Sequence, residues 1–294
     1  MHHPIGCLTM TTIAPWAPAS PEEHEFHYNP QRAFPDFAAH RSRRAPMNDT
    51  ALGSLRRTAD LTYGEHPRRR LDIYPAARPR APMHVFFHGG YWRTNDKSGF
   101  AFVAQALVRR GFTAVIPNYE LCPDSTLDGT VDSALAAIEW TVRNGGAHGG
   151  DPTSVSLSGH SAGAHLCAAA LATDWTARGL DPSFLRAATL ISGVYDPAPA
   201  MLTTVNEDLR LTPEIAARHD YERITPRSRA QVNLFVGGKE PWRWIEQTFR
   251  YSHHLRRHGG DPAVQVISGH DHFSILDQYV ADDSPVLNAI SSHA

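Results

Sequence analysis

The 294-residue sequence has few cysteines, little net charge and no long apolar run, and each shortage excludes a class of protein. Its three cysteines are an odd number at wide spacings, which argues against a secreted disulfide framework. Lys and Arg number 28 against 30 Asp and Glu, so the chain as a whole is not drawn to nucleic acid or to an anionic membrane. No stretch approaches the roughly 18 apolar residues of a membrane span. The N-terminus also lacks the basic and then apolar pattern of a signal peptide. We therefore expect a cytoplasmic protein.

The composition is that of a globular protein, with 41% hydrophobic and 20% charged residues. Residues 1–26 show little periodicity and several prolines, which predicts a mobile tail. Residues 27–294 are expected to form a single domain that opens with a cap-like segment at about 27–65. Eleven arginines against five acidic residues lie between positions 31 and 80. We interpret this excess as a solvated surface, with a polyanion-binding patch as the alternative.

From residue 71 onward, short apolar runs alternate with helical periodicity. Several runs lack polar alternation, which is typical of strands buried on both faces of a parallel sheet. Helices are expected around 100–110, 131–144 and 161–172. This order predicts an α/β fold with a mostly parallel central sheet flanked by helices. The predicted strands are Leu71–Tyr74, Met83–Phe87, Thr113–Pro117, Val155–Ser158, Ala188–Ser192, Val232–Val236 and Ala263–Ile267.

The most informative motif is G-x-S-x-G at residues 159–163, between an apolar strand and an alanine-rich helix. This is the context of a nucleophile elbow, in which a sharp strand-to-helix turn exposes a serine. Small residues are needed two positions before and after Ser161, because the turn brings backbone segments together. The helix N-terminus also favours a developing negative charge. Ser161 is therefore the predicted nucleophile.

A second motif, His88-Gly89-Gly90, directly follows a predicted strand. Acyl-transfer enzymes need backbone N–H groups aimed at the tetrahedral oxyanion, and adjacent glycines allow close approach of the backbone. The predicted oxyanion donors are the N–H groups of Gly90, Tyr91 and Ala162. His88 is interpreted as a loop-bracing residue, because the base of this architecture follows the nucleophile.

The general base and its acidic partner are expected after the nucleophile. His270 and His272 both follow the last predicted strand, and we prefer His272 because an apolar run after it would pack it in place. Glu240, just beyond the strand Val232–Val236, is the predicted acid that orients the imidazole. Asp196 is the alternative acid.

No metal or cofactor is expected. The pattern H-x-H occurs at 270–272, but the sequence has no H-E-x-x-H, paired C-x-x-C, G-x-G-x-x-G or Walker motif. Aromatic residues near the predicted motifs offer a subsite for a planar ring, namely Tyr91, Trp92, Trp242 and Trp244.

Three segments together resemble the α/β-hydrolase-type kynurenine formamidases, which are related to the hormone-sensitive-lipase-like esterases. They are HGGYWR at 88–93, NYELCP at 118–123 and GHSAGAHL at 159–166. The resemblance implies an α/β-hydrolase fold with Ser161, Glu240 and His272 as the triad. Gln247 matches a glutamine of the family's helix, whereas the segment Pro241–Trp244 is bulkier than the family's.

The expected function is that of a serine hydrolase that cleaves N-formyl arylamines through an acyl-enzyme. Its partner would be a small aryl amide or ester, and Arg93 and Arg243 are candidates to meet a substrate carboxylate. A general carboxylesterase or aryl-acylamidase with the same triad is one alternative, and a catalytically dead binding scaffold is another. The sequence leaves the oligomeric state open, and a homodimer is compatible with it.

Overall fold

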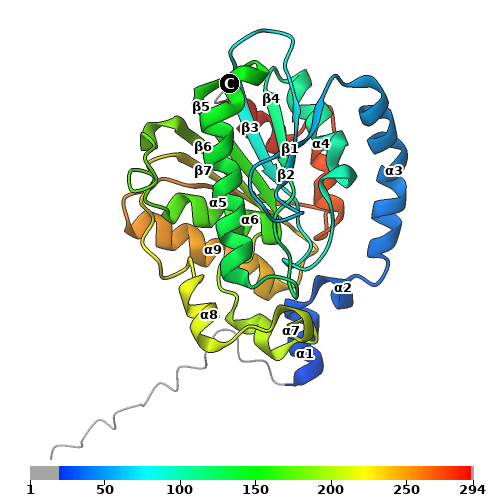
Figure 1. Cartoon of the computed structure of the whole chain (residues 1–294). Helices are drawn as coiled ribbons and strands as arrows, with labels where there is room; N and C mark the ends of the chain where they lie inside the picture. The colour runs from blue at the N-terminus through cyan, green and yellow to red at the C-terminus, as the bar shows by residue number, and fades with distance from the viewer. Residues whose placement is uncertain (1–19, 293–294) are drawn as a thin grey trace, which may run out of the picture.

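A computed structural model of the chain describes residues 20–292 (Figure 1). An eight-stranded sheet forms its centre, in the order β1-β2-β4-β3-β5-β6-β7-β8. Pairing is antiparallel from β1 through β2 to β4 and parallel across the rest of the sheet. The predicted mostly parallel sheet is thereby confirmed. The strands are β1 (Thr58–Thr62), β2 (Arg70–Tyr74), β3 (Ala81–Phe87), β4 (Thr113–Pro117), β5 (Gly150–His160), β6 (Leu185–Ile191), β7 (Gln231–Gly237) and β8 (Ala263–Ile267).

Two apolar clusters cover the two faces of this sheet. Successive side chains of a strand point to opposite faces, so a continuous apolar run supplies both clusters. On β3, for example, Val85 joins one cluster and Phe86 joins the other. The helices α5 (Leu127–Asn144), α6 (Ala162–Ala172) and α9 (Trp242–Arg257) cover the first face. The helices α4 (Ala101–Arg109) and α10 (Pro285–Ser291) cover the second.

The helices predicted by periodicity are present as α4, α5 and α6. Thr126 caps α5 by accepting a hydrogen bond from the N–H of Gly129 at 3.3 Å. Helix α6 is buried around its whole circumference, as its alanine-rich sequence predicts. Between β6 and β7 lie the short helices α7 (Asn206–Leu209) and α8 (Pro213–Arg218), and the remaining helical turns are 3₁₀: η1 (Lys97–Phe100), η2 (Gly145–His148), η3 (Pro182–Phe184), η4 (Ala198–Leu202) and η5 (Ser274–Tyr279).

The N-terminal part differs from the sequence prediction. Residues 1–19 of the expected tail lie outside the described residues. Residues 21–26 are not a tail, because they belong to helix α1 (Pro21–Tyr28). Ser20 caps this helix by accepting from the N–H of Glu23 at 3.1 Å, and proline at the first helical position suits a helix start. The short α2 (Pro30–Ala33) and the long α3 (Phe37–Ser54) follow.

Helix α3 packs against α4 at the outside of the molecule (Figure 1). Only three of its residues are buried, and it contains Pro46 in its interior. Polar contacts hold it in place. The Arg44 guanidinium donates to Asp277 at 2.8 Å. The Asn48 side chain donates to the carbonyl of Ser98 in η1 and accepts from the N–H of Ala101, the first residue of α4. The segment that the sequence predicts to be cap-like therefore contains a helix with little apolar attachment.

Six of the eleven arginines in the arginine-rich segment form ion pairs with described residues of the chain. Arg69, for example, pairs with Glu120 at 2.7 Å and with Asp132 at 2.9 Å. Partly exposed pairs of this kind contribute little to stability. They neutralise part of the local positive charge, which favours a solvated surface over a polyanion-binding patch.

The core contains two free thiols and a buried histidine. Cys122 and Cys167 are buried free thiols, whereas Cys7 lies outside the described residues. His84 on β3 is buried between the hydroxyl groups of Ser156 and Ser158 on β5, at 2.7 Å from each. Burial lowers the pKa of His84 to about 3, so it is neutral at pH 7. Among residues 20–292, no helix is both long and apolar enough to cross a membrane.

Candidate active site

Ser161 occupies the sharp turn between β5 and α6. Its backbone has φ 56° and ψ −120°, a conformation that residues other than glycine rarely adopt. The Ser161 N–H donates to the carbonyl of Ile191 at 2.8 Å and so ties the turn to the end of β6. A strained serine fixed at the carboxyl end of a central strand is the geometry of a nucleophile elbow.

The two glycines of the motif are required by close backbone contacts at this turn. A Cβ atom on Gly159 would lie 2.2 Å from the carbonyl oxygen of Gly163. A Cβ atom on Gly163 would lie 2.0 Å from the carbonyl oxygen of Phe87, at the end of β3. Any larger residue at either position would push the turn away from the sheet, so the spacing in G-x-S-x-G has a steric cause.

His272 and Glu240 meet Ser161 in a hydrogen-bonded line. His272 Nε2 lies 3.0 Å from Ser161 Oγ, and His272 Nδ1 lies 2.7 Å from Glu240 Oε2. The exposed fractions of Ser161, Glu240 and His272 are 4%, 5% and 2%. Hydrogen bonds and charge interactions in such a dry environment are stronger than in water. The structure thus brings together the three residues that the sequence nominates.

The carboxylate of Glu240 is held at both oxygens. Oε1 accepts from the N–H of Gly237 at 2.7 Å and from the Ser192 hydroxyl group, which leaves Oε2 for His272. Trp244 strengthens this arrangement, since its indole N–H donates to the carbonyl of Ser192 at 2.8 Å. The Trp244 ring also packs edge-on against the His272 imidazole, with centroids 4.8 Å apart. The acid and the base are therefore fixed in position before any substrate binds.

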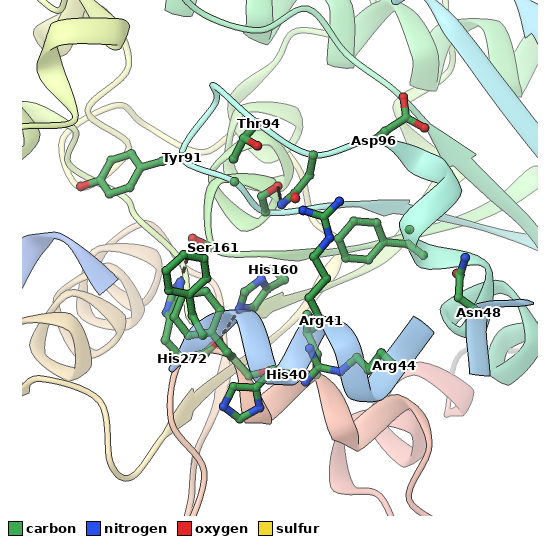
Figure 2. A pocket seen from close by; sticks show the side chains of 18 of the residues that line it. His40, Arg41, Arg44, Asn48, Tyr91, Thr94, Asp96, His160, Ser161 and His272 are labelled. Carbon is green, nitrogen blue, oxygen red and sulfur yellow. Dashed lines mark hydrogen bonds between the residues drawn. The ribbon is translucent and has the colours of Figure 1, made fainter. Parts of the chain in front are cut away.

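His160, the residue before Ser161, holds the loop that carries the base. Its Nε2–H donates to the carbonyl of His272 at 2.7 Å (Figure 2). Burial, together with the nearby His272, holds the pKa of His160 well below its ordinary value, so the ring stays neutral. The sequence analysis did not find this role. The x position of the motif carries no signal for it, because the partner lies on a distant loop.

The alternative residues lie elsewhere. His270 Nδ1 is 3.0 Å from the carbonyl of Ser274, within its own loop. Asp196 accepts from the N–H of Ala198 at 2.9 Å and so caps its loop, and burial raises its pKa. Among the described residues neither side chain makes a hydrogen bond to Ser161 or His272.

The predicted oxyanion donors lie beside the serine. Gly90 and Tyr91 have φ values of 126° and 53°, which turn this loop sharply at the end of β3. Ala162 is the first residue of α6. Among residues 20–292, the N–H groups of these three residues donate no hydrogen bond to another residue. They are available to an oxyanion, and that of Ala162 lies at the positive end of the α6 dipole.

His88 braces this loop. Its carbonyl accepts a hydrogen bond from the Tyr119 hydroxyl group at 2.7 Å, and the two rings stack with centroids 4.5 Å apart. Burial lowers the pKa of His88 to about 4, which makes it a neutral structural side chain.

A cavity with a volume of about 360 Å³ opens beside Ser161 (Figure 2). The nucleophile, the base and the oxyanion loop line it, and α3 forms another of its walls. The volume suits a small molecule with one aromatic ring. The lining residues of α3 are Phe37, His40, Arg41, Arg44, Ala45, Asn48 and Asp49, and the sequence analysis identified none of them.

The three predicted substrate-binding tryptophans are not lining residues of this cavity, which corrects the expected aromatic subsite. Trp92 is completely buried and packs against His165, with centroids 4.8 Å apart. Trp244 is buried beneath His272. Trp242, the first residue of α9, is half exposed. The Arg243 guanidinium carbon lies 4.3 Å from the centroid of its ring. Tyr91 does line the cavity, but its hydroxyl group donates to the carbonyl of Tyr28 at 2.7 Å.

The two arginines proposed for a substrate carboxylate already have partners. Arg93 bonds Asp208 at 2.6 Å and Gln31 at 3.2 Å, and Arg243 lies 3.5 Å from Glu246. Gln247 is buried in α9 and accepts from the N–H of Tyr195 at 3.3 Å. In the part of the chain that the structure describes, no three His, Cys, Asp or Glu side chains gather as a metal-binding group.

Known proteins with similar sequences are hydrolases. A family model for the alpha/beta hydrolase fold matches residues 84–275. The chain is 30% identical to a kynurenine formamidase of Danio rerio over 284 residues, which cover 92% of this chain and 95% of the relative. It is 34% identical to an isoprenylcysteine alpha-carbonyl methylesterase of Arabidopsis thaliana, but only over 38% of this chain and 26% of that one.

Solved structures share the fold. A hyperthermophilic esterase from the archaeon Pyrobaculum calidifontis superposes with a TM-score of 0.70 at 18% identity, covering 87% of this chain and 90% of the esterase. A candidate thioesterase from Silicibacter sp. TM1040 gives a TM-score of 0.80 at 24% identity, covering 91% of this chain and 99% of that one.

Proposed function

Because this chain belongs to the kynurenine formamidase family of α/β hydrolases, we propose that it hydrolyses N-formyl arylamines through a covalent formyl-serine intermediate. One observation carries the proposal. The buried line Ser161–His272–Glu240 ends at a cavity beside unpaired N–H groups, in a chain that matches a kynurenine formamidase along nearly its whole length.

In the first step, His272 Nε2 takes the proton of Ser161 as Oγ attacks the formyl carbon. Glu240 holds the imidazole so that its proton-bearing nitrogen is Nδ1, and it stabilises the imidazolium that forms. The 2.7 Å and 3.0 Å distances on either side of the ring support these two roles.

The tetrahedral oxyanion is then held by the N–H groups of Gly90, Tyr91 and Ala162. The C–N bond breaks, and the arylamine leaves with the proton returned by His272. Water, deprotonated by the same imidazole, attacks the formyl ester, so formate leaves and Ser161 regains its proton. The balance requires one water and no cofactor.

A rate comparison on matched substrates tests this function. We expect kcat/KM to fall steeply from the formyl to the acetyl to the butyryl amide of one arylamine. A flat or rising series, with p-nitrophenyl butyrate as the best substrate, would instead identify a carboxylesterase. The resemblance to a methylesterase over 38% of this chain keeps that second candidate in the test.

A fluorophosphonate probe separates both enzymes from a dead scaffold. An activated serine attacks the phosphorus of the probe, fluoride leaves and the serine is phosphonylated, whereas an inert serine does not react. We expect labelling of the parent protein and none of Ser161→Ala. An unlabelled parent protein would favour a binding role.

Location and assembly remain proposals. A cytoplasmic location is supported by an odd number of widely spaced cysteines, which suits a reducing compartment. A homodimer stays a prediction that light scattering on the purified protein tests.

A further inference from the structure

The charged side chains that line the cavity differ in whether they already bond other protein groups. Arg44 bonds Asp277 and the carbonyl of Phe273, and Arg93 bonds Asp208. Asp96 accepts from the N–H of Ser98 and from the side chain of Asn118. Each of these charges is balanced by protein groups and is poorly placed to bind a ligand as well.

Arg41 is different. It is an exposed residue that lines the cavity, and among residues 20–292 its side chain makes no ion pair or hydrogen bond with another protein group. Figure 2 shows its side chain crossing the cavity from α3 toward the loop that carries Thr94, while Arg44 stays beside the helix. The cavity is thus lined by a solvent-exposed guanidinium that has no partner among the described residues and that lies away from Ser161.

Asp49 also lines the cavity without a side-chain partner among the described residues, but it does not neutralise Arg41. The two residues are eight positions apart on α3, so their Cα atoms are separated by about 12 Å along the helix axis at 1.5 Å per residue. An anion that enters the cavity therefore meets Arg41 without displacing a protein carboxylate.

From this arrangement, and resting on the proposed function, we propose that Arg41 is a specificity-determining residue that binds a carboxylate on the leaving arylamine. A guanidinium presents a planar fork of donors that matches a carboxylate with two parallel hydrogen bonds. With the formyl carbon at Ser161 and the ring between, the acidic end of an amino-acid-bearing arylamine extends toward α3. The site thereby favours arylamines with an anionic side chain over neutral anilides.

The test compares Arg41→Gln with Arg43→Gln on two substrates. Arg43 is a matched control because it lies on the same helix, pairs with Asp277 and is not a lining residue of the cavity. The substrates are N-formylkynurenine and N-formyl-2-aminoacetophenone, which keeps the aryl ketone and lacks the amino-acid group. We expect Arg41→Gln to lower kcat/KM for the first about ten- to a hundredfold more than for the second, the range of a charged hydrogen bond.

The loss should appear mainly in KM, because the contact is equal in the ground and transition states. Arg41→Lys should restore part of it, and Arg43→Gln should not discriminate between the substrates. Equal losses on both substrates, or a similar discrimination by Arg43→Gln, would overturn the role of Arg41.

A second readout stands apart from formamidase activity. Kynurenine and 2-aminoacetophenone are tested as competitive inhibitors of p-nitrophenyl acetate hydrolysis. Arg41→Gln should raise the inhibition constant of kynurenine at least tenfold more than that of the ketone. If the parent enzyme fails on N-formyl substrates but shows this difference, the proposed function is wrong and the anion site stands. If the difference is absent, the anion site is wrong.

Discussion

Replacing Glu240 by glutamine tests the central electrostatic argument, because the surroundings of this side chain dictate how an amide must orient. Oε1 accepts from the Gly237 N–H and from the Ser192 hydroxyl group. The backbone donor cannot rotate, so the amide oxygen of a glutamine must take this side. A flipped amide would leave buried donors facing one another, at a cost of about 1–3 kcal/mol each.

The glutamine NH₂ group then faces His272 Nδ1. An NH₂ group only donates, so Nδ1 must be the unprotonated nitrogen and the proton moves to Nε2. That nitrogen lies 3.0 Å from Ser161 Oγ and can no longer accept its proton. The acid-to-amide change in serine hydrolase triads lowers kcat by about 10⁴-fold, or about 5 kcal/mol of barrier. We expect the same loss here, with little change in KM and a fully folded protein.

The assay is the initial rate on an N-formyl arylamine, with circular dichroism and a thermal melt to verify folding. Asp196→Asn is the matched control, because this carboxylate also follows a central strand but caps its own loop. It should cost less than about tenfold. A folded Glu240→Gln variant within tenfold of the parent enzyme, or a larger loss in Asp196→Asn, would refute the tautomer argument.

Three further results are expected. Ser161→Ala should keep the fold and lose several orders of magnitude in kcat, and near-normal turnover would disprove a serine mechanism. His272→Gln should be as damaging, whereas His270→Gln should retain most activity, because the His270 side chain bonds only Ser274 and Gln278 of η5. The reverse order of rates would exchange their roles. His84 has a folded pKa of about 3 against an ordinary 6.5, so below pH 6.5 the unfolded chain binds a proton that the folded one does not, and stability falls as the pH falls. The free energy of unfolding is measured in urea at pH 7, 6 and 5 for the parent protein and for His84→Gln. Below pH 6, its slope against pH should be shallower in His84→Gln by about 1.4 kcal/mol per pH unit. Identical slopes in the two proteins would contradict this.

Most of the sheet was predictable because inner strands such as β3, β4 and β6 are buried on both faces and so form nearly uninterrupted apolar runs. All seven predicted strands are present as β2–β8. Strand β1 was not predicted, because Thr58–Thr62 is a mostly exposed edge strand with polar residues and no alternation to reveal it. Helix α3 was not predicted either, since only three of its residues are buried and Pro46 interrupts its sequence pattern.

The candidate triad was nominated from local motifs and chain order, which the fold's topology constrains strongly. The cavity could not be predicted in the same way. Which residues face a hollow depends on how distant elements pack, and residue type alone does not distinguish a tryptophan in the core from one in a pocket. Trp92, which was predicted to bind substrate, is therefore found in the core. Arg41, which the sequence marks only as part of an arginine-rich segment, lines the cavity.

The weak apolar attachment of α3 has a consequence for how the cavity behaves over time. An element held by a few polar contacts opens locally at a much lower free energy than a central strand such as β5, whose side chains are packed on both faces. The amides of α3 should therefore exchange with deuterium long before those of β5. A ligand seated between α3 and Ser161 binds only the closed form, so occupancy slows that exchange in proportion to ligand concentration. The cavity wall is thus also a reporter, because the exchange rate of one helix gives the fraction of sites filled without any turnover being measured.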